Sequence, residues 1–124
     1  MSATRAVGRY GEDVAVRHLA DAGWTVLARN WRHSEPEMRG ELDIVAVDPA
    51  EDCLVAVEVK TRRSLRAGHP LEAVTDLKVR QVRRLLAAWC VQYEPAAARL
   101  RVDVLAVTVP AAGAAQVEHV RAVG

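Results

Sequence analysis

The sequence predicts a small α/β or α+β domain in which two helices cover a β-sheet, in the order αβββαββ. Apolar residues recur at helical spacing in two segments, and short runs rich in Val, Leu and Ala lie between and after these segments. Turn-forming Gly, Pro and Asp separate the runs. The chain has 124 residues, so we expect one domain over 1–124, with its core at about 4–109 and a last strand at about 116–122.

The first half of the chain predicts a helix followed by three strands. The helix is expected from about Thr4 to Ala22, because its apolar stripe ends at Gly23, a residue that favours helix termination. Three strands are expected next, at Trp24–Trp31, Glu41–Val47 and Leu54–Thr61. A polar loop, Arg32–Gly40, separates the first two strands, and a turn, Asp48–Cys53, separates the last two.

The second half predicts a helix and two strands after a basic connection. This helix begins between Leu71 and Asp76 and ends near Tyr93. Its expected apolar stripe consists of Val82, Leu85, Leu86, Trp89 and Tyr93. The last two strands are expected at Arg101–Val109 and Gln116–Ala122.

Composition excludes several classes of protein. With 51% hydrophobic and 27% charged residues, the chain is unlike a disordered one. Its two cysteines form no CxxC motif, which argues against a disulfide framework or a zinc ribbon. No apolar run reaches the roughly 18 residues that cross a bilayer, and residues 1–16 lack the apolar segment of a signal peptide. We therefore expect a cytoplasmic protein with no membrane partner.

Three charged residues interrupt strands that are otherwise apolar on both faces. The segments ELDIVAV and LVAVEVK are typical of strands covered on both faces, and they contain Asp43, Glu58 and Lys60. A buried charge costs several kcal/mol unless it is paired or binds a metal. A symmetric turn would pair Glu58 with Asp43, so that the two carboxylates converge, with Lys60 further along the same face.

Two interpretations of this cluster stay open on physical grounds. Two oxygen ligands on rigid strands suit a Mg²⁺ site, where the ammonium can orient the attacking water or steady the phosphate. Alternatively, Lys60 forms a structural ion pair with one of the acids. A register slip of one residue would separate the carboxylates. Glu41 is either a third acid of the site or simply a residue at the edge of the strand. Asp103 is expected to make a structural hydrogen bond rather than to act in catalysis.

Basic residues are concentrated in one window of the chain. Between Lys60 and Arg84 the net charge is +6, against −5 in the remainder. This pattern fits either a footprint on a phosphate backbone or a solvated helix face. The candidate nucleic-acid-binding residues are Arg62, Arg63, Arg66, Lys78, Arg80, Arg83 and Arg84. The chain has 15 Arg and two Lys, which favours a specific use for the ammonium of Lys60.

The charged positions carry a resemblance to a known superfamily. The spacing of these residues is similar to the PD-(D/E)xK signature of restriction-endonuclease-like proteins: Asp43 is followed by 14 residues and then by Glu58-Val59-Lys60. The segments GRYGEDVAVRHLADAGW, RNWR, GELDIVAVD, VAVEVKTR and AVTDLKVRQVRRL resemble, in this order, the YraN-like family of small bacterial proteins. This family is grouped with the endonuclease fold, near the archaeal Holliday-junction resolvases. The match spans roughly residues 8–107, although Leu42 stands where the superfamily has a proline.

The resemblance implies a fold and a set of roles. The fold is α/β and restriction-endonuclease-like, with a central mixed sheet of about five strands flanked by helices. Asp43 and Glu58 would be metal ligands, completed by the backbone carbonyl of Val59, and Lys60 would be the catalytic lysine. Glu12 matches a helix-borne acid that some of these nucleases add. Helical spacing places it about a quarter turn off the centre of the apolar stripe, so its side chain either reaches the site or points to solvent.

The function expected from this resemblance is hydrolysis of DNA phosphodiester bonds by a divalent-metal-dependent endonuclease-like protein, acting on branched or damaged DNA. The expected cofactor is Mg²⁺ or Mn²⁺, and a homodimer would suit a two-strand substrate. Two alternatives remain open: a non-catalytic nucleic-acid-binding module of the same fold, and a protein-interaction scaffold whose acid–lysine network is structural.

Overall fold

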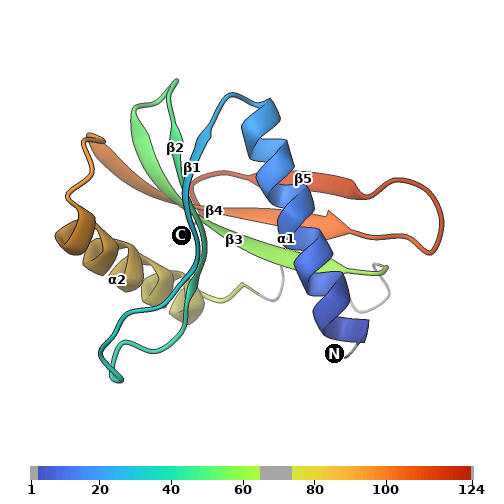
Figure 1. Cartoon of the computed structure of the whole chain (residues 1–124), viewed down its shortest axis with the longest axis horizontal. Coiled ribbons are helices and arrows are strands. Elements are labelled where there is room, and N and C mark those ends of the chain that lie inside the picture. The colour runs from blue at the N-terminus through green and yellow to red at the C-terminus, as the bar shows by residue number, and fades with distance from the viewer. Residues whose placement is uncertain (1–2, 65–73, 124) are drawn as a thin grey trace.

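A computed structural model describes residues 3–64 and 74–123, which form a five-stranded sheet with a helix against each face (Figure 1). In chain order the elements are α1 (Ala3–Asp21), β1 (Thr25–Trp31), β2 (Leu42–Asp48), β3 (Cys53–Arg62), α2 (Asp76–Tyr93), β4 (Arg99–Thr108) and β5 (Gln116–Val120). The predicted order αβββαββ is confirmed, and most element boundaries differ from the prediction by one or two residues.

The sheet follows chain order, β1-β2-β3-β4-β5. Strands β3 and β4 pair in parallel and the other neighbours are antiparallel, so the sheet is mixed, as predicted. Parallel neighbours need a long connection, and helix α2 lies within the one between β3 and β4.

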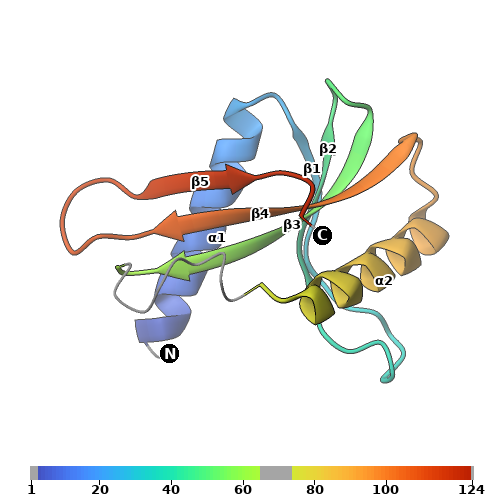
Figure 2. The ribbon, with the colours of Figure 1, turned by 180° about the vertical axis from the view of Figure 1, so that it is seen from behind.

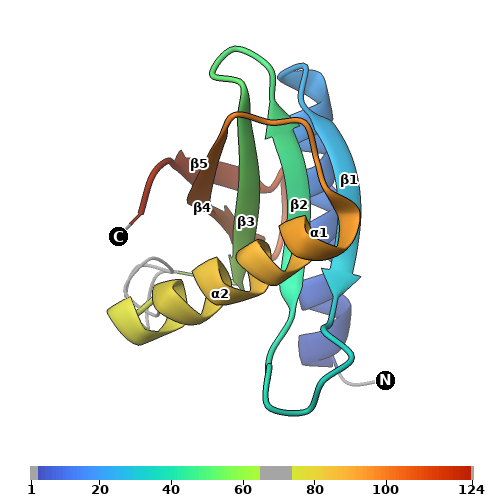
Figure 3. The same cartoon turned by 90° about the vertical axis from the view of Figure 1, so that its left-hand side faces the viewer.

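The two helices cover opposite faces of the sheet. Figure 2 views the sheet from behind, with α1 beyond the strands, and Figure 3 shows α2 crossing in front of β2 and β3. Under α1 the buried core consists of Ala15, Leu19, Trp24, Ile44, Ala46, Cys53, Val55, Val57 and Leu105. Under α2 it consists of Leu42, Val45, Leu54, Ala56, Val82, Leu85, Leu86, Trp89 and Val102. Coverage on both faces explains why the paired segments 44–47 of β2 and 54–57 of β3 are apolar on both faces.

The predicted turn at Asp48–Cys53 and the predicted apolar stripe of α2 are each wrong in one detail. Asp48 and Cys53 are not turn residues: they pair at the ends of β2 and β3 and are 1% and 3% exposed. Asp48 tolerates burial because Arg101 donates to its Oδ2 at 3.0 Å. On α2, Val79 is buried, whereas Tyr93 is 49% exposed because it is the last residue of the helix.

A buried ion network holds the C-terminal segment against the sheet. Asp103, which is fully buried in β4, accepts hydrogen bonds from Arg101 at 2.8 and 2.9 Å and from the backbone N–H of Ala122 at 3.0 Å. His119 on β5 lies 2.8 Å from Asp103 Oδ2. These partners hold the pKa of Asp103 below its ordinary value despite the opposing effect of burial. Asp103 therefore has the structural role predicted for it.

In the described part of the chain, no helix is long and apolar enough to span a membrane.

Candidate metal centre and nucleic-acid interface

Asp43 lies where β2 and β3 stop pairing. The observed ladder includes the predicted pairs Val47↔Leu54 and Val45↔Ala56, and its register brings Asp43 opposite Glu58 one position beyond the last paired residues. At this point the backbone N–H of Val59 donates to Asp43 Oδ2 at 2.9 Å. The Asp43 carboxylate thus takes the place of the backbone carbonyl that would accept this hydrogen bond in a continued ladder, and the hydrogen bond fixes the position of the carboxylate.

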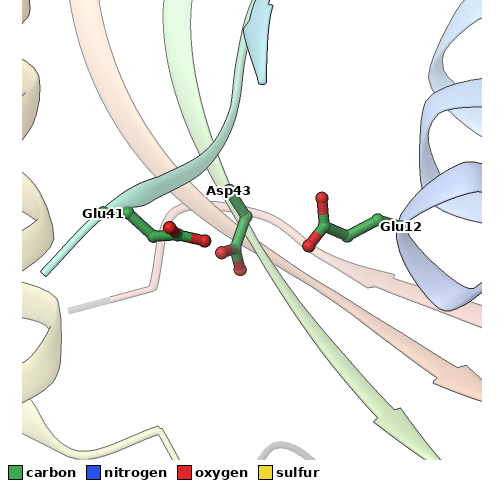
Figure 4. Close-up of side chains that lie close together, drawn as sticks. All are labelled: Glu12, Glu41 and Asp43. Atoms are coloured by element: carbon green, nitrogen blue, oxygen red, sulfur yellow. The ribbon is translucent and has the colours of Figure 1, made fainter. Parts of the chain in front are cut away.

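Three carboxylates from separate parts of the fold converge at this position. Glu12 comes from α1, Glu41 directly precedes β2, and Asp43 lies on β2 (Figure 4). One oxygen of each lies within 4.8 Å of the others, and all three residues are half-buried. Arg29 and Arg32 contact the outer members: Arg29 is 3.8 Å from Glu12 Oε1, and Arg32 Nε donates to Glu41 Oε2 at 3.1 Å.

The electrostatics of this acidic cluster (Glu12, Glu41 and Asp43) favour a bound cation. Burial is the main cause that raises the pKa of Asp43, and the neighbouring Glu41 raises it further. Burial and then Asp43 raise the pKa of Glu12. Glu12 Oε1 is buried and has no hydrogen-bond partner among the described residues. A divalent cation that prefers oxygen ligands would relieve this repulsion and bind the Glu12 oxygen that lacks a hydrogen bond, so the residues fit Mg²⁺ or Mn²⁺.

Glu58 binds both lysines of the chain. Its Oε1 lies 3.9 Å from Lys60 Nζ on the same strand and 3.7 Å from Lys78 Nζ on α2. The side chain is 6% exposed, and burial, followed by repulsion from Asp43, raises the pKa of Glu58 to about 7 although both ammonium groups oppose the shift. Glu58 is therefore poised between a lysine-paired carboxylate and a neutral acid.

A cleft of about 420 Å³ opens beside the acidic cluster. Its lining combines acids, small residues and basic residues: Val7, Gly8, Glu12, Asp43, Val59, Thr61, Arg62 and Arg63. Gly11 brings α1 against β3 here, because a Cβ at this position would overlap Thr61 Oγ1. Close approach of the helix places Glu12, the next residue, beside Asp43.

Sequence comparison assigns the chain to a family. A profile described as "Uncharacterised protein family UPF0102" matches residues 11–107, about four-fifths of the chain. The chain belongs to the UPF0102 family.

Relatives in the UPF0102 family match over almost the whole chain. A UPF0102 protein of Kineococcus radiotolerans is 54% identical over 119 residues, covering 95% of this chain and 93% of the relative. A UPF0102 protein of Beutenbergia cavernae is 52% identical over 124 residues and all of both chains. The matched UPF0102 region, 11–107, contains the three carboxylates as well as Glu58 and both lysines.

The structure arranges the predicted site residues of this UPF0102 member in two adjoining groups. Asp43 and Glu12 lie together, and Val59 lines the cleft beside them. Glu58 and Lys60 contact each other in the second group. Among the described residues, the three acids whose oxygens all lie within 4.8 Å of one another are those of the acidic cluster. Glu58 is not one of the three, but it adjoins them, because its carboxyl group interacts directly with that of Asp43.

The predicted basic residues divide between the cleft and helix α2. Arg62 and Arg63 line the cleft, and Lys78 contacts Glu58. The exposed side of α2 carries Arg80, Arg83 and Arg84, at the i, i+3 and i+4 spacing of one helix face. Arg66 lies outside the described residues.

The sequence patterns leave the role of Glu41 open and give no indication of the role of Gln81. Glu41 lies outside the β2 ladder, so strand periodicity does not define where its side chain points. The available signal was its position two residues before Asp43. Gln81 donates from α2 to the carbonyl of Arg39 at 2.6 Å, across 42 residues of sequence, and no local pattern indicates such a contact.

Proposed function

We propose that this protein is a divalent-metal-dependent nuclease that hydrolyses phosphodiester bonds of nucleic acid. One observation carries the proposal: three carboxylate oxygens lie within 4.8 Å of one another, and two of these acids, Glu12 and Asp43, line a cleft together with Arg62 and Arg63. Metal-assisted phosphodiester hydrolysis needs carboxylates that bind the metal ion and, next to them, basic side chains that bind the phosphate.

Glu12, Glu41 and Asp43 would hold the metal. When bound, Mg²⁺ or Mn²⁺ supplies Lewis-acid stabilisation of charge on the phosphate and favours ionisation of a water. The chain's own residues orient the substrate: Arg62 and Arg63 bind phosphates along the cleft through their guanidinium groups.

Glu58 and the two lysines complete the proposed reaction centre. The ammonium groups of Lys60 and Lys78 offset negative charge that develops on the phosphate, and Glu58 keeps both within 3.9 Å of its Oε1. Because its pKa is about 7, Glu58 can accept or release a proton near neutral pH.

DNA is the substrate class that we propose, with branched or damaged DNA ahead of intact duplex. Support comes from the resemblance to Holliday-junction resolvases together with the exposed arginines of α2. Arginine contacts of this kind bind the phosphate backbone without reading sequence, so affinity should fall as salt rises.

A cleavage assay with purified full-length protein tests the proposal. Supercoiled plasmid and synthetic four-way, flap and single-stranded DNAs are incubated with Mg²⁺, Mn²⁺ or EDTA. Lys60→Ala and Glu12→Gln are compared with Asp52→Asn, a control at the exposed β2–β3 turn. Metal-dependent cutting that the first two variants lose and the control retains is expected.

A non-catalytic nucleic-acid-binding module is the second candidate. It is favoured by the pairing of Glu58 with both lysines, which satisfies these charges without a metal. Salt-sensitive DNA binding without cutting in any metal would support this module and overturn the nuclease. If the protein neither bound nor cut DNA, this result would favour a protein-interaction scaffold.

A further inference from the structure

Helix α2 contacts the segment that leads into the acidic cluster. Gln81, on the side of α2 that faces this segment, donates from Nε2 to the carbonyl oxygen of Arg39 at 2.6 Å. Arg39 lies two residues before Glu41, so the hydrogen bond joins the helix to the backbone from which Glu41 extends.

The backbone at Gly40 is shaped to receive this side chain. Gly40 has a φ of +92°, a conformation that other residues rarely adopt. A Cβ at this position would lie 2.8 Å from Gln81 Nε2 and 3.6 Å from Leu85 Cδ1. Gly40 therefore allows the loop backbone to approach Gln81 closely, and the same residue turns the chain toward Glu41.

Other restraints on this segment are weaker. The β1–β2 ladder begins at Trp31↔Leu42, so Glu41 lies outside it. Arg32 pairs with Glu41, but the Arg32 side chain is 72% exposed, and such surface pairs contribute little. A cavity of about 100 Å³ lies between the loop and α2, lined by Met38, Arg39, Gln81 and neighbouring residues. Met38 packs against the core beside this cavity, but it lies three residues before Glu41.

We propose that Gln81 is a positioning residue for the acidic cluster. By holding the Arg39 carbonyl, Gln81 sets the backbone from which Glu41 reaches Glu12 and Asp43, and it thereby sets the affinity of the cluster for a divalent cation. This inference rests on the proposed metal site. Lys78, one turn earlier on α2, contacts Glu58, so the same helix supports both groups of the reaction centre.

Titration of the purified full-length protein with MnCl₂ by calorimetry tests the inference. Gln81→Leu removes the donor while keeping a side chain of similar size, and Gln81→Met is a second variant should the first fold poorly. The dissociation constant is expected to rise about three- to tenfold, the effect of one net hydrogen bond. Gln92→Leu, an exposed position on the same helix, is the matched control and should bind as the wild type does.

A double-mutant cycle distinguishes positioning from general destabilisation. Glu41→Gln leaves two carboxylates in the cluster and should weaken Mn²⁺ binding by itself. If Gln81 acts through Glu41, adding Gln81→Leu to Glu41→Gln has no further effect on the dissociation constant. Melting temperatures measured in EDTA report the structural effect of each substitution separately.

The outcomes separate this inference from the proposed function. Wild-type affinity in both Gln81 variants would overturn the positioning role and leave the metal site intact. An equal loss of affinity with and without Glu41 would also overturn it, because Gln81 would then act by another route. Absence of Mn²⁺ binding by the wild type would overturn the metal site itself, and the positioning role with it.

Discussion

The backbone N–H of Val59 donates a 2.9 Å hydrogen bond to Asp43 Oδ2 at the point where β2 and β3 cease to pair. A strand ladder that ends inside a covered sheet would leave a backbone donor without a partner. The Asp43 side chain satisfies that donor, and the same hydrogen bond fixes the carboxylate beside Glu12 and Glu41. One residue thus serves the fold and the proposed metal centre together.

These two roles of Asp43 are separable by mutation. Asp43→Asn keeps an oxygen acceptor for the Val59 N–H but removes the charge, so it should leave the melting temperature unchanged or raised. Cleavage should fall by about 100-fold or more, because a cation ligand is removed. Asp43→Ala removes the acceptor as well and should cost about 1–3 kcal/mol of unfolding free energy. Cleavage assays and urea denaturation measure the two effects. If Asp43→Asn left cleavage, metal binding and melting temperature all unchanged, the site would be wrong.

The raised pKa of Glu58 predicts how stability depends on pH. The folded protein binds this proton with a pKa of about 7, whereas the ordinary value is 4.5, so the folded state holds more protons between these values. Stability should therefore fall as pH rises from about 5 to 8. Melting curves in EDTA for the wild type and Glu58→Gln measure the effect of Glu58 together with its influence on Asp43, because the remaining titrating groups are common to both proteins. A difference between the two proteins that does not vary with pH would contradict the prediction.

The approach of α1 to β3 predicts opposite effects at two glycines. Gly11→Ala would place a methyl group against Thr61 Oγ1, so α1 must shift, at a cost of about 1–3 kcal/mol. The shift would move Glu12 and weaken Mn²⁺ binding. Gly8→Ala meets nothing within 4 Å and should stabilise the helix by about 0.5–1 kcal/mol. Chemical denaturation measures both, and equal effects at the two sites would show that the contact with Thr61 does not matter.

Asp103 is predicted to be a major determinant of stability. Asp103→Ala leaves the Arg101 guanidinium without one of its two carboxylate partners and the Ala122 N–H without an acceptor. Breaking a buried ion pair on one side typically costs about 3–5 kcal/mol. Guanidinium denaturation against the Asp52→Asn control measures the loss. A cost below about 1 kcal/mol would mean that the network does not anchor β5.

The arginines of α2 are predicted to set the salt dependence of DNA binding. Replacing Arg80, Arg83 and Arg84 together by Gln should weaken binding to all DNA sequences alike. It should also reduce the slope of log affinity against log salt by up to about 0.9 for each phosphate that the variant no longer neutralises. Fluorescence anisotropy with four-way DNA at several salt concentrations gives the slope. Arg17→Gln on α1 is the control, and an unchanged slope in the triple variant would remove α2 from the interface.

Local sequence patterns predicted much of the fold and part of the candidate site. With a symmetric turn assumed, the strand patterns paired Val45 with Ala56; the structure has this pair, and its register brings Asp43 next to Glu58. The burial of Asp48 was not predictable in this way, because its partner, Arg101, is 53 residues distant. Likewise, helical periodicity placed Glu12 near the edge of the apolar stripe of α1 and did not decide whether it reaches Asp43.

The sequence by itself determined the elements of this protein and the charged residues within them, because periodicity and turn chemistry act over short distances. It predicted the register of β2 on β3 on the assumption of a symmetric turn. Only the tertiary structure decided which charges meet. It joined Glu12, Glu41 and Asp43 into one cluster and brought Lys78 from α2 to Glu58. The physical reason is that helix packing against a twisted sheet sets these distances, and the contacts that position the helices, such as Gly11 on Thr61, lie far apart in the sequence.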